Sequence, residues 1–474
     1  MKYMKIRKLG HDKRELTVFK TLSIATFLII SSMSTAYAYD TTANTNSTYR
    51  DQAKRIHDRL IGVPPTSDAL NVMANLLDPT RDGDGDGNNE GDNDGAVKAA
   101  KYAMTSSSDP AIGNPLAKYF YNITLKNWVT PWTNEDQTVF APLNDYTATV
   151  IGMIRDEIPF SNVLTRDIVY VGNVGNIQST ESVTIPGHSN NSNAHYEALE
   201  SNDIDLSNDQ YLERRTQTEM GMAGGPAGIM TTRAAGQAFF EAGTNRAMFR
   251  FTSMNYLCRD LEDLKDVARN PDRIRQDVSR SPGGDSSIFL NSCIGCHAGM
   301  DPLTGAFAYY EWNETTGLVE YTSGNVQAKY HINSTNFENG FRTINDAWRN
   351  YWRIGPNAGL GWGSEAEVNA ILASAQSTQT VIVTTETDGN SNVINEVSFG
   401  SGAASMGAEL AATEAFAQCQ VEKVYKQVCL QDPIANHDIE SLSLRFMNKH
   451  TTQTNLGYNM KDLFAEVAAL CRGN

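Results

Sequence analysis

Residues 293–297 read Cys293-Ile294-Gly295-Cys296-His297, and this stretch decides how the segment around it folds. On a helical turn Cys293, Cys296 and His297 are related as i, i+3 and i+4, so the three side chains project from one face. C-x-x-C-H is the attachment signature of a c-type haem, whose porphyrin edge is bonded by both thiols. His297 would then reach the iron as the proximal ligand. We therefore expect one covalent haem c here.

A structural zinc site is the main alternative explanation of this motif. Zinc usually takes four ligands, commonly as a second Cys or His pair at short spacing, and the sequence has no such pair. A chance match is disfavoured because the chain contains few Cys and His residues. The motif occurs once, which argues against dihaem peroxidases and multihaem electron wires.

The ligand on the far side of the iron would decide the chemistry. A Met thioether or a second His gives a closed electron carrier, whereas an open position permits reaction with peroxide or small gases. Met300 is too close to His297 in sequence to cross to the far face. We name Met406 and His331 as candidate distal ligands, with a core methionine and a surface histidine as the ordinary alternatives.

The N-terminus has the pattern of a signal peptide over residues 1–38. A basic stretch, MKYMKIRKLGHDKRELTVFK, precedes the apolar run TLSIATFLIISSM and a small-x-small cleavage site, Ala36-Tyr37-Ala38. The apolar run is short for a membrane span, so an uncleaved anchor is the alternative. No transmembrane helix is expected after cleavage. Since haem is attached to C-x-x-C-H outside the cytoplasm, we expect a periplasmic or secreted protein.

Charge narrows the choice of partners. The whole chain has a formal net charge of −16, and removal of residues 1–38, with seven basic and two acidic residues, would make it −21. Such a charge argues against nucleic acid or anionic lipid as a partner. It would steer a basic redox partner protein toward the molecule, although an acidic surface also simply favours solubility.

Four cysteines lie outside the haem motif: Cys258, Cys419, Cys429 and Cys471. In an oxidising compartment they suggest two disulfides. Cys419 and Cys429 lie on one predicted helix, about 15 Å apart, which is too far for a disulfide. Cys258 and Cys471 would therefore each pair with one of them. We favour Cys258–Cys419 and Cys429–Cys471, with free buried thiols as the alternative.

The acidic stretch TRDGDGDGNNEGDNDG, residues 80–95, is similar to the start of an EF-hand calcium loop. Aspartates occupy positions 1, 3 and 5, but position 12 is Asn rather than the bidentate Glu of that motif. A solvated acidic linker is the alternative. The candidate calcium ligands are Asp82, Asp84, Asp86, Asn88, Glu90 and Asn93.

Periodicity predicts a mainly α-helical, multi-module protein with a c-type haem module and a small β-hairpin. Helices are expected over 50–77, split by Pro64-Pro65, and over 96–132, 143–158, 228–261, 406–428, 438–449 and 461–471. A short strand is expected in DIVYVGNVG, a polar loop over 185–212, and the hairpin over 380–399. After the signal peptide, the expected domains are 39–160 (N-terminal, helical, with the acidic Asp/Gly loop), 161–255 (middle, helical, with the polar loop), 256–363 (c-type haem) and 364–474 (C-terminal, helical, with the hairpin).

Two local features bear on the haem environment. Asp301-Pro302 predicts a helix end or turn that would fold the aromatic residues at 307–312 back over the porphyrin, although these could equally fill an ordinary core. In TNRAMFRF, Arg246 and Arg250 share a helix face, where either can pair with a haem propionate or form a surface salt bridge.

Several blocks resemble the planctomycete-type cytochrome c-associated protein family. RIHDRLIGVPPTSDAL is similar to its R-R…L-x-G-L-P-P-T-x-x-E opening, and CIGCHAGMDPLTGAFAYYEW to its C-x-x-C-H-x-x-x-D-P-x-G-x-A-L-E-N-F-D block. AFAQCQVEKVYKQV and YNMKDLFAEVAAL are similar to its C-terminal helical domain. The resemblance implies haem at Cys293, Cys296 and His297 and a turn at Asp301-Pro302 and Gly305. It departs at residues 310–312, which read Tyr-Glu-Trp instead of the family's polar block.

The sequence therefore predicts an exported monohaem c-type cytochrome that transfers single electrons. Two alternatives remain. One is a haem enzyme of the oxidase or peroxidase type, with an open distal site. The other is a cell-surface binding module in which the haem is structural.

Overall fold

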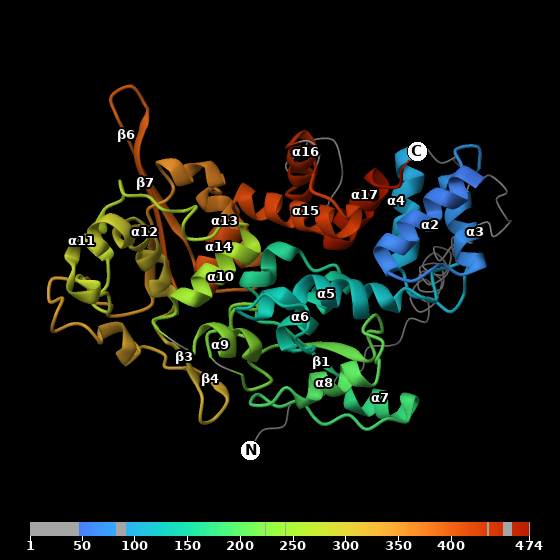
Figure 1. The fold of residues 1–474 in the computed structure, drawn as a ribbon, viewed down its shortest axis with the longest axis horizontal. Coiled ribbons are helices and arrows are strands. Elements are labelled where there is room, and N and C mark those ends of the chain that lie inside the picture. The colour runs from blue at the N-terminus through green and yellow to red at the C-terminus, as the bar shows by residue number, and fades with distance from the viewer. Residues whose placement is uncertain are drawn as a thin grey trace, which may run out of the picture.

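The computed structural model describes residues 47–81, 92–222, 224–241, 243–433, 436–448 and 457–473. The expected signal peptide lies outside these residues, as does most of the acidic loop. In the described part the protein is mainly α-helical with small antiparallel sheets, as the sequence predicts (Figure 1).

The first helices follow the sequence pattern closely. Helix α2 (Ser47–Ile61) and helix α3 (Ser67–Leu77) are separated at Pro64-Pro65. Thr66 caps α3, because its Oγ1 accepts a hydrogen bond from the amide of Ala69 at 3.2 Å. Helix α4 (Asp92–Met104) packs against both helices and against the C-terminal helix α17 (Met460–Leu470), which brings the two ends of the described chain together.

The remaining helices vary in length. The α-helices are α5 (Lys126–Val129), α6 (Asp145–Arg155), α7 (Val174–Glu181), α8 (Ala194–Ser201), α9 (Arg233–Phe239), α10 (Arg246–Tyr256), α11 (Ser286–Ile288), α12 (Ile294–Thr304), α13 (Glu365–Ser374), α14 (Ala403–Ala411), α15 (Glu414–Cys429) and α16 (Asn436–Phe446). π-helical turns lie at Phe120–Leu125 and Phe289–Cys293, and 3-10 turns at Thr130–Thr133, Phe160–Leu164, Pro271–Arg273, Pro282–Gly284, Gly305–Phe307, Ala328–His331 and Pro356–Leu360.

The described residues also contain three small antiparallel sheets. Strand β1 (Val169–Gly172) pairs with β2 (Leu212–Arg215), and β3 (Tyr310–Asn313) pairs with β4 (Leu318–Tyr321). The expected hairpin is β6 (Ile382–Thr387) and β7 (Val393–Ser401), and it projects from the body of the molecule (Figure 1). The hairpin gains a third strand, β5 (Ala347–Asn350), which pairs with β7 from Ala347↔Ser401.

Several expectations about local structure are corrected. The helix expected over 96–132 is interrupted between α4 and the π-helical turn Phe120–Leu125, and the helix expected over 228–261 is divided into α9 and α10. Residues 185–212 are not only a loop, because they contain α8 and lead into β2. The helix expected over 406–428 is two helices, α14 and α15, because Thr413 starts a new one by accepting the amide of Phe416 at 3.0 Å.

A single large hydrophobic core contains buried residues from Ala53 to Ala469, so helices distant in sequence share it. A smaller, separate cluster lies next to the C-x-x-C-H motif and contains Ile274, Val278, Phe289 and Ala298. In Figure 1 helix α12, which holds Cys296 and His297, and its neighbour α11 lie at one end of the long axis, and α2, α3 and α4 at the other. No helix in the described ranges is long and apolar enough to cross a bilayer.

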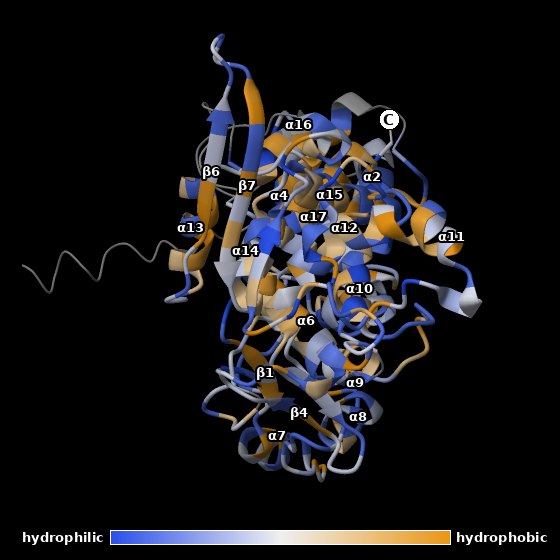
Figure 2. Cartoon of the chain, turned by 90° about the vertical axis from the view of Figure 1, so that its left-hand side faces the viewer, coloured by the Kyte–Doolittle hydropathy of each residue, from blue (hydrophilic) through white to orange (hydrophobic). Residues whose placement is uncertain are grey.

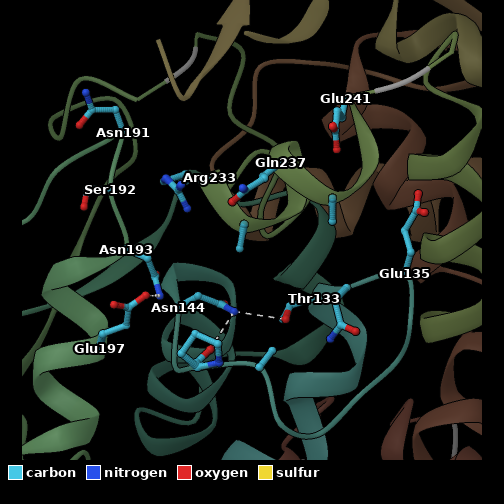
Figure 3. Close-up of a pocket in the computed structure, with 15 residues that line it drawn as sticks. Thr133, Glu135, Asn144, Asn191, Ser192, Asn193, Glu197, Arg233, Gln237 and Glu241 are labelled. Atoms are coloured by element: carbon cyan, nitrogen blue, oxygen red, sulfur yellow. Dashed lines mark hydrogen bonds between the residues drawn. The ribbon is translucent and has the colours of Figure 1, made fainter. Parts of the chain in front are cut away.

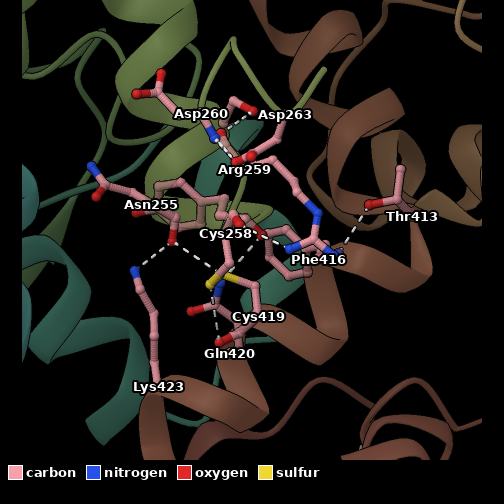
Figure 4. The surroundings of a disulfide bond; sticks show 12 residues. Asn255, Cys258, Arg259, Asp260, Asp263, Thr413, Phe416, Cys419, Gln420 and Lys423 are labelled. Atoms are coloured by element: carbon pink, nitrogen blue, oxygen red, sulfur yellow. Dashed lines mark hydrogen bonds between the residues drawn. A yellow bond between two sulfur atoms is a disulfide. The ribbon is translucent and has the colours of Figure 1, made fainter. Parts of the chain in front are cut away.

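Two disulfides tie α15 to its neighbours. Cys258 bonds Cys419, with the Cα atoms 5.3 Å apart, and Cys429 bonds Cys471, with the Cα atoms 5.5 Å apart. This is the pairing favoured from the sequence. Around the first disulfide, Lys423 donates to the carbonyl of Asn255 (Figure 4). Burial lowers the pKa of Lys423 well below its ordinary value.

Candidate functional site

The motif residues lie on one continuous helical run. Residues 286–304 comprise α11, a π-helical turn ending at Cys293, and α12, whose first turns hold Cys296 and His297. Both thiols are unpaired and half-buried, whereas the other four cysteines form disulfides. Burial, reinforced by the charge of Glu262, raises the pKa of the Cys296 thiol. The structure therefore keeps the two motif thiols apart from the disulfide framework.

His297 is held by a carboxylate one helical turn further along α12. Its Nδ1 lies 3.0 Å from Oδ1 of Asp301, whose side chain is fully buried. Since a carboxylate only accepts hydrogen bonds, Nδ1 is the protonated nitrogen of the neutral ring. The lone pair on Nε2 is then left for another partner, which is the tautomer that a metal-binding histidine needs.

Arg246, the first residue of α10, fixes Asp301 in this position. Its Nε donates to Asp301 Oδ1 at 2.8 Å and its Nη2 to Oδ2 at 3.1 Å. The same guanidinium donates to Asp277 at 2.7 Å and 3.0 Å, so it clamps two buried carboxylates by paired hydrogen bonds. Arg275 completes the cluster, with its guanidinium 3.3 Å from Asp277 and its amide 3.3 Å from Asp301 Oδ2.

This cluster keeps its carboxylates ionised. Burial alone would raise the pKa of Asp301, but the charge of Arg246, the contact with His297 and the charge of Arg275 together lower it below its ordinary value. In Asp277 burial is likewise outweighed, first by Arg275 and then by Arg246, and its pKa is lowered. Asp301 is therefore a permanent anionic acceptor for His297.

Asp301-Pro302 does not itself form a turn, because both residues lie inside α12; the helix ends two residues later, at Thr304, and the 3-10 turn Gly305–Phe307 follows. The hydrogen bonds of Asp301 to α10 and to His297 require it to remain on this helix. The downstream aromatic residues do not join the cluster beside the motif either. Tyr310 instead stacks on Phe240 in the main core, with ring centroids 5.4 Å apart.

Arg280 is a further cation beside the motif, and no local sequence pattern pointed to it. Its guanidinium carbon lies 4.3 Å from the ring centroid of Phe289 and 3.5 Å from that of Phe337. Its Nε is buried without a hydrogen-bond partner among the described residues, and burial lowers the pKa of the guanidinium. The two arginines singled out from the sequence are already paired: Arg246 as above, and Arg250 with Asp260 at 2.6 Å.

Apolar side chains are exposed next to the motif. Val267 is 72% exposed and lies beside Gly295, while Leu290 is 60% exposed. Helix α11 lies at the edge of the molecule in Figure 2, and its last residue, Ile288, is 44% exposed. An apolar group seated on the motif would cover such side chains and remove their surface from water.

The residues present fit a haem c group. Two unpaired thiols, one imidazole with an available Nε2, a guanidinium for a propionate and exposed apolar side chains are the chemistry that such a group requires. For a structural zinc ion the described residues provide no cluster of three or more His, Cys, Asp and Glu side chains.

Neither candidate distal ligand belongs to the small apolar cluster beside the motif. Met406 is fully buried on α14 within the main core, whereas Cys293 packs against the separate small cluster. His331 ends the turn Ala328–His331, and its Nδ1 is buried with no hydrogen-bond partner. Of the calcium candidates, residues 82–90 lie outside the described residues, and only the backbone of Asn93 is placed, in the first turn of α4.

A polar cavity of about 650 Å³ lies apart from the motif, between α8, α9 and the 3-10 turn Thr130–Thr133 (Figure 3). Glu135, Glu197 and Glu241 line it together with Arg233, whose Nε has no hydrogen-bond partner. The guanidinium of Arg233 lies 5.6 Å from the ring centroid of Trp312. Such a lining suits a polar ligand, but sequence reasoning did not find it because its residues come from separate segments.

Comparisons with protein-family models, with curated proteins and with solved structures found no match. The function must therefore be inferred from the residues and their geometry.

Proposed function

We propose that the chain is an exported c-type cytochrome with a single haem that transfers one electron at a time. Cys293 and Cys296 would hold the haem covalently, and Nε2 of His297 would bind its iron. The bound iron supplies the one-electron chemistry. The observation that carries the proposal is the arrangement of two unpaired thiols on one helical run with an imidazole whose Nδ1 is tied to Asp301.

Several features support this assignment. The disulfides and the signal-like N-terminus agree with export to the periplasm or the medium, where haem is attached to such motifs. Arg280 lies over the ring of Phe289, whose centroid is 6.4 Å from that of His297, and a guanidinium there is suited to a propionate. The resemblance of several sequence blocks to the planctomycete-type cytochrome c-associated proteins points the same way. With a formal charge of −16, the chain would attract a basic redox partner protein.

The test is expression of the full chain in a bacterium with its haem-attachment machinery. We expect mass spectrometry to find one haem per chain after denaturation and the reduced protein to have the absorption bands of a c-type cytochrome. The variant with both C293A and C296A should carry none, while the matched control with C429S and C471S should still carry it. Wild-type protein without covalent haem would reject the proposal.

A haem enzyme with an open distal site is the second candidate. Two observations favour it: the carboxylate bound to His297, and the burial of Met406 in the main core rather than in the small cluster beside the motif. Carbon monoxide distinguishes the candidates. A reduced spectrum that CO leaves unchanged supports an electron carrier, whereas rapid CO binding together with peroxide turnover supports the enzyme.

A further inference from the structure

The hydrogen bond between His297 and Asp301 bears on the electronic properties of a haem bound through His297, as well as on how the haem is held. We propose that Asp301 is a positioning residue that lowers the reduction potential of the haem, through its hydrogen bond to Nδ1 of His297. This inference rests on the proposed function, because it requires a haem iron on Nε2. It assigns to Asp301 a role in setting how readily the protein gives up its electron.

The physical basis is the charge of the acceptor. An anionic acceptor draws the Nδ1 proton toward itself more strongly than a neutral carbonyl would, and this raises the electron density that Nε2 offers to a metal. A more basic ligand stabilises ferric iron more than ferrous iron. The distance of 3.0 Å and the complete burial of the carboxylate mean that water does not weaken this interaction.

The guanidinium of Arg246 opposes this effect, since its Nε donates to the same Oδ1 that accepts from His297. Arg246 is shared with Asp277, however, and the two arginines and two aspartates of the cluster balance in formal charge. Of the four charged side chains in this cluster, the one that contacts the imidazole of His297 is the carboxylate of Asp301, so the nearest of these charges is negative.

The same contacts prevent Asp301 from turning away. Four donors occupy its two oxygens: His297 Nδ1 and Arg246 Nε on Oδ1, and Arg246 Nη2 and the Arg275 amide on Oδ2. A carboxylate has about four lone-pair positions, so this one is saturated. The acceptor, and with it the imidazole plane, is fixed by α10 and by the segment that carries Arg275.

The experiment measures the midpoint potential of the full haem-loaded chain by spectroelectrochemistry. The Asp301→Asn variant keeps the shape of the side chain and removes its charge. We expect its potential to rise by at least 59 mV, which is a tenfold change in the one-electron equilibrium constant. The matched control is Asp277→Asn, which removes one charge from the same cluster without touching His297, and its rise should be less than half as large.

The outcomes separate the two proposals. Covalent haem in D301N with the wild-type potential, or an equal rise in D277N, would overturn the role of Asp301 and leave the cytochrome intact. Absence of covalent haem from the wild-type chain would overturn both.

A second measurement uses the wild-type protein alone, so it does not depend on whether a variant folds. Resonance Raman spectroscopy of the reduced wild-type protein, made transiently five-coordinate by photolysis, reports the stretching frequency between iron and His297. We expect it to exceed the frequency of a haem histidine that donates to a backbone carbonyl. A frequency at the carbonyl value would contradict the inference even if D301N failed to accumulate.

Discussion

Arg246 and Asp301 are joined by two parallel hydrogen bonds, from Nε to Oδ1 at 2.8 Å and from Nη2 to Oδ2 at 3.1 Å. The side chain of Asp301 has no exposed surface, and that of Asp277, which binds the same guanidinium, has none either. Because α10 and α12 meet through this clamp, the position of the C-x-x-C-H motif depends on a residue far from it in sequence. Removal of Arg246 would leave the buried Asp301 without its main counterion and Asp277 with Arg275 alone.

We expect the Arg246→Ala variant to lose about 3–5 kcal/mol of unfolding free energy, the usual consequence of breaking a buried ion pair from one side. Urea denaturation followed by circular dichroism measures this loss. The matched control is Arg250→Ala, on the same helix one turn later. Arg250 is 45% exposed and pairs with an Asp260 that is 34% exposed, so its loss should stay below about 1 kcal/mol. Equal losses in the two variants would contradict the buried clamp.

The local pattern of the sequence predicted much of the fold. Hydrophobic periodicity and the Pro64-Pro65 break predicted α2 and α3, and alternation around the Asp388–Asn392 turn predicted the β6–β7 hairpin. Such features depend on neighbours in sequence. The addition of β5 to the hairpin was missed, because the pairing of Ala347 with Ser401 joins distant segments whose local patterns are independent.

The same limit applies to the site. The sequence identified the C-x-x-C-H residues because their spacing is local. It did not identify the contacts that hold His297 through Asp301 and Arg246. Asp301 was noted only as a turn residue, although the i, i+4 spacing of His297 and Asp301 on a helix could have indicated their contact. Arg275 and Arg280 gave no signal, since Asp301 and Tyr330 beside Arg275, and Phe337 beside Arg280, come from other segments.

The close contact between α12 and Trp352 leads to a second prediction. A Cβ added at Gly299 would lie 1.9 Å from Nε1 of Trp352, which is 1% exposed and cannot move aside. We expect Gly299→Ala to destabilise the protein by about 1–3 kcal/mol, although alanine is ordinarily favoured in helices. Gly295→Ala is the control, because its new methyl would face the flexible side chain of Lys265 and the exposed side chain of Val267. Thermal melting compares them, and a G299A variant as stable as G295A would disprove the packing argument.

The two sets of cysteines should be separable by mutation. The variant with C258S and C419S opens a disulfide whose cysteines are 161 residues apart, and should lose about 5 kcal/mol by the chain-entropy argument. The variant with C429S and C471S, where the separation is 42 residues, should lose about 4 kcal/mol. Both should retain covalent haem, as measured by mass spectrometry of protein purified at low temperature. Loss of haem from both would indicate that the disulfides and the motif are not independent.

Acid should destabilise the protein through His57. His57 is fully buried, with Nδ1 donating to the carbonyl of Val63 at 3.0 Å and Nε2 accepting from Nδ2 of Asn114 at 3.0 Å. Burial lowers the pKa of His57 from 6.5 to about 4, despite the hydrogen bond to Val63. The folded state therefore binds fewer protons than the unfolded state between these values, so stability is complete above pH 6.5 and falls as the pH drops toward 4.

The expected size of this loss is roughly 3 kcal/mol, because each pKa unit corresponds to about 1.4 kcal/mol. Urea denaturation from pH 7 to pH 4 would measure the slope for the wild type and for His57→Gln, which keeps a polar side chain but does not titrate. The variant should start less stable at pH 7 and lose less stability on acidification. Parallel slopes for the two proteins would show that His57 takes up its proton equally in both states, contrary to its burial between Val63 and Asn114.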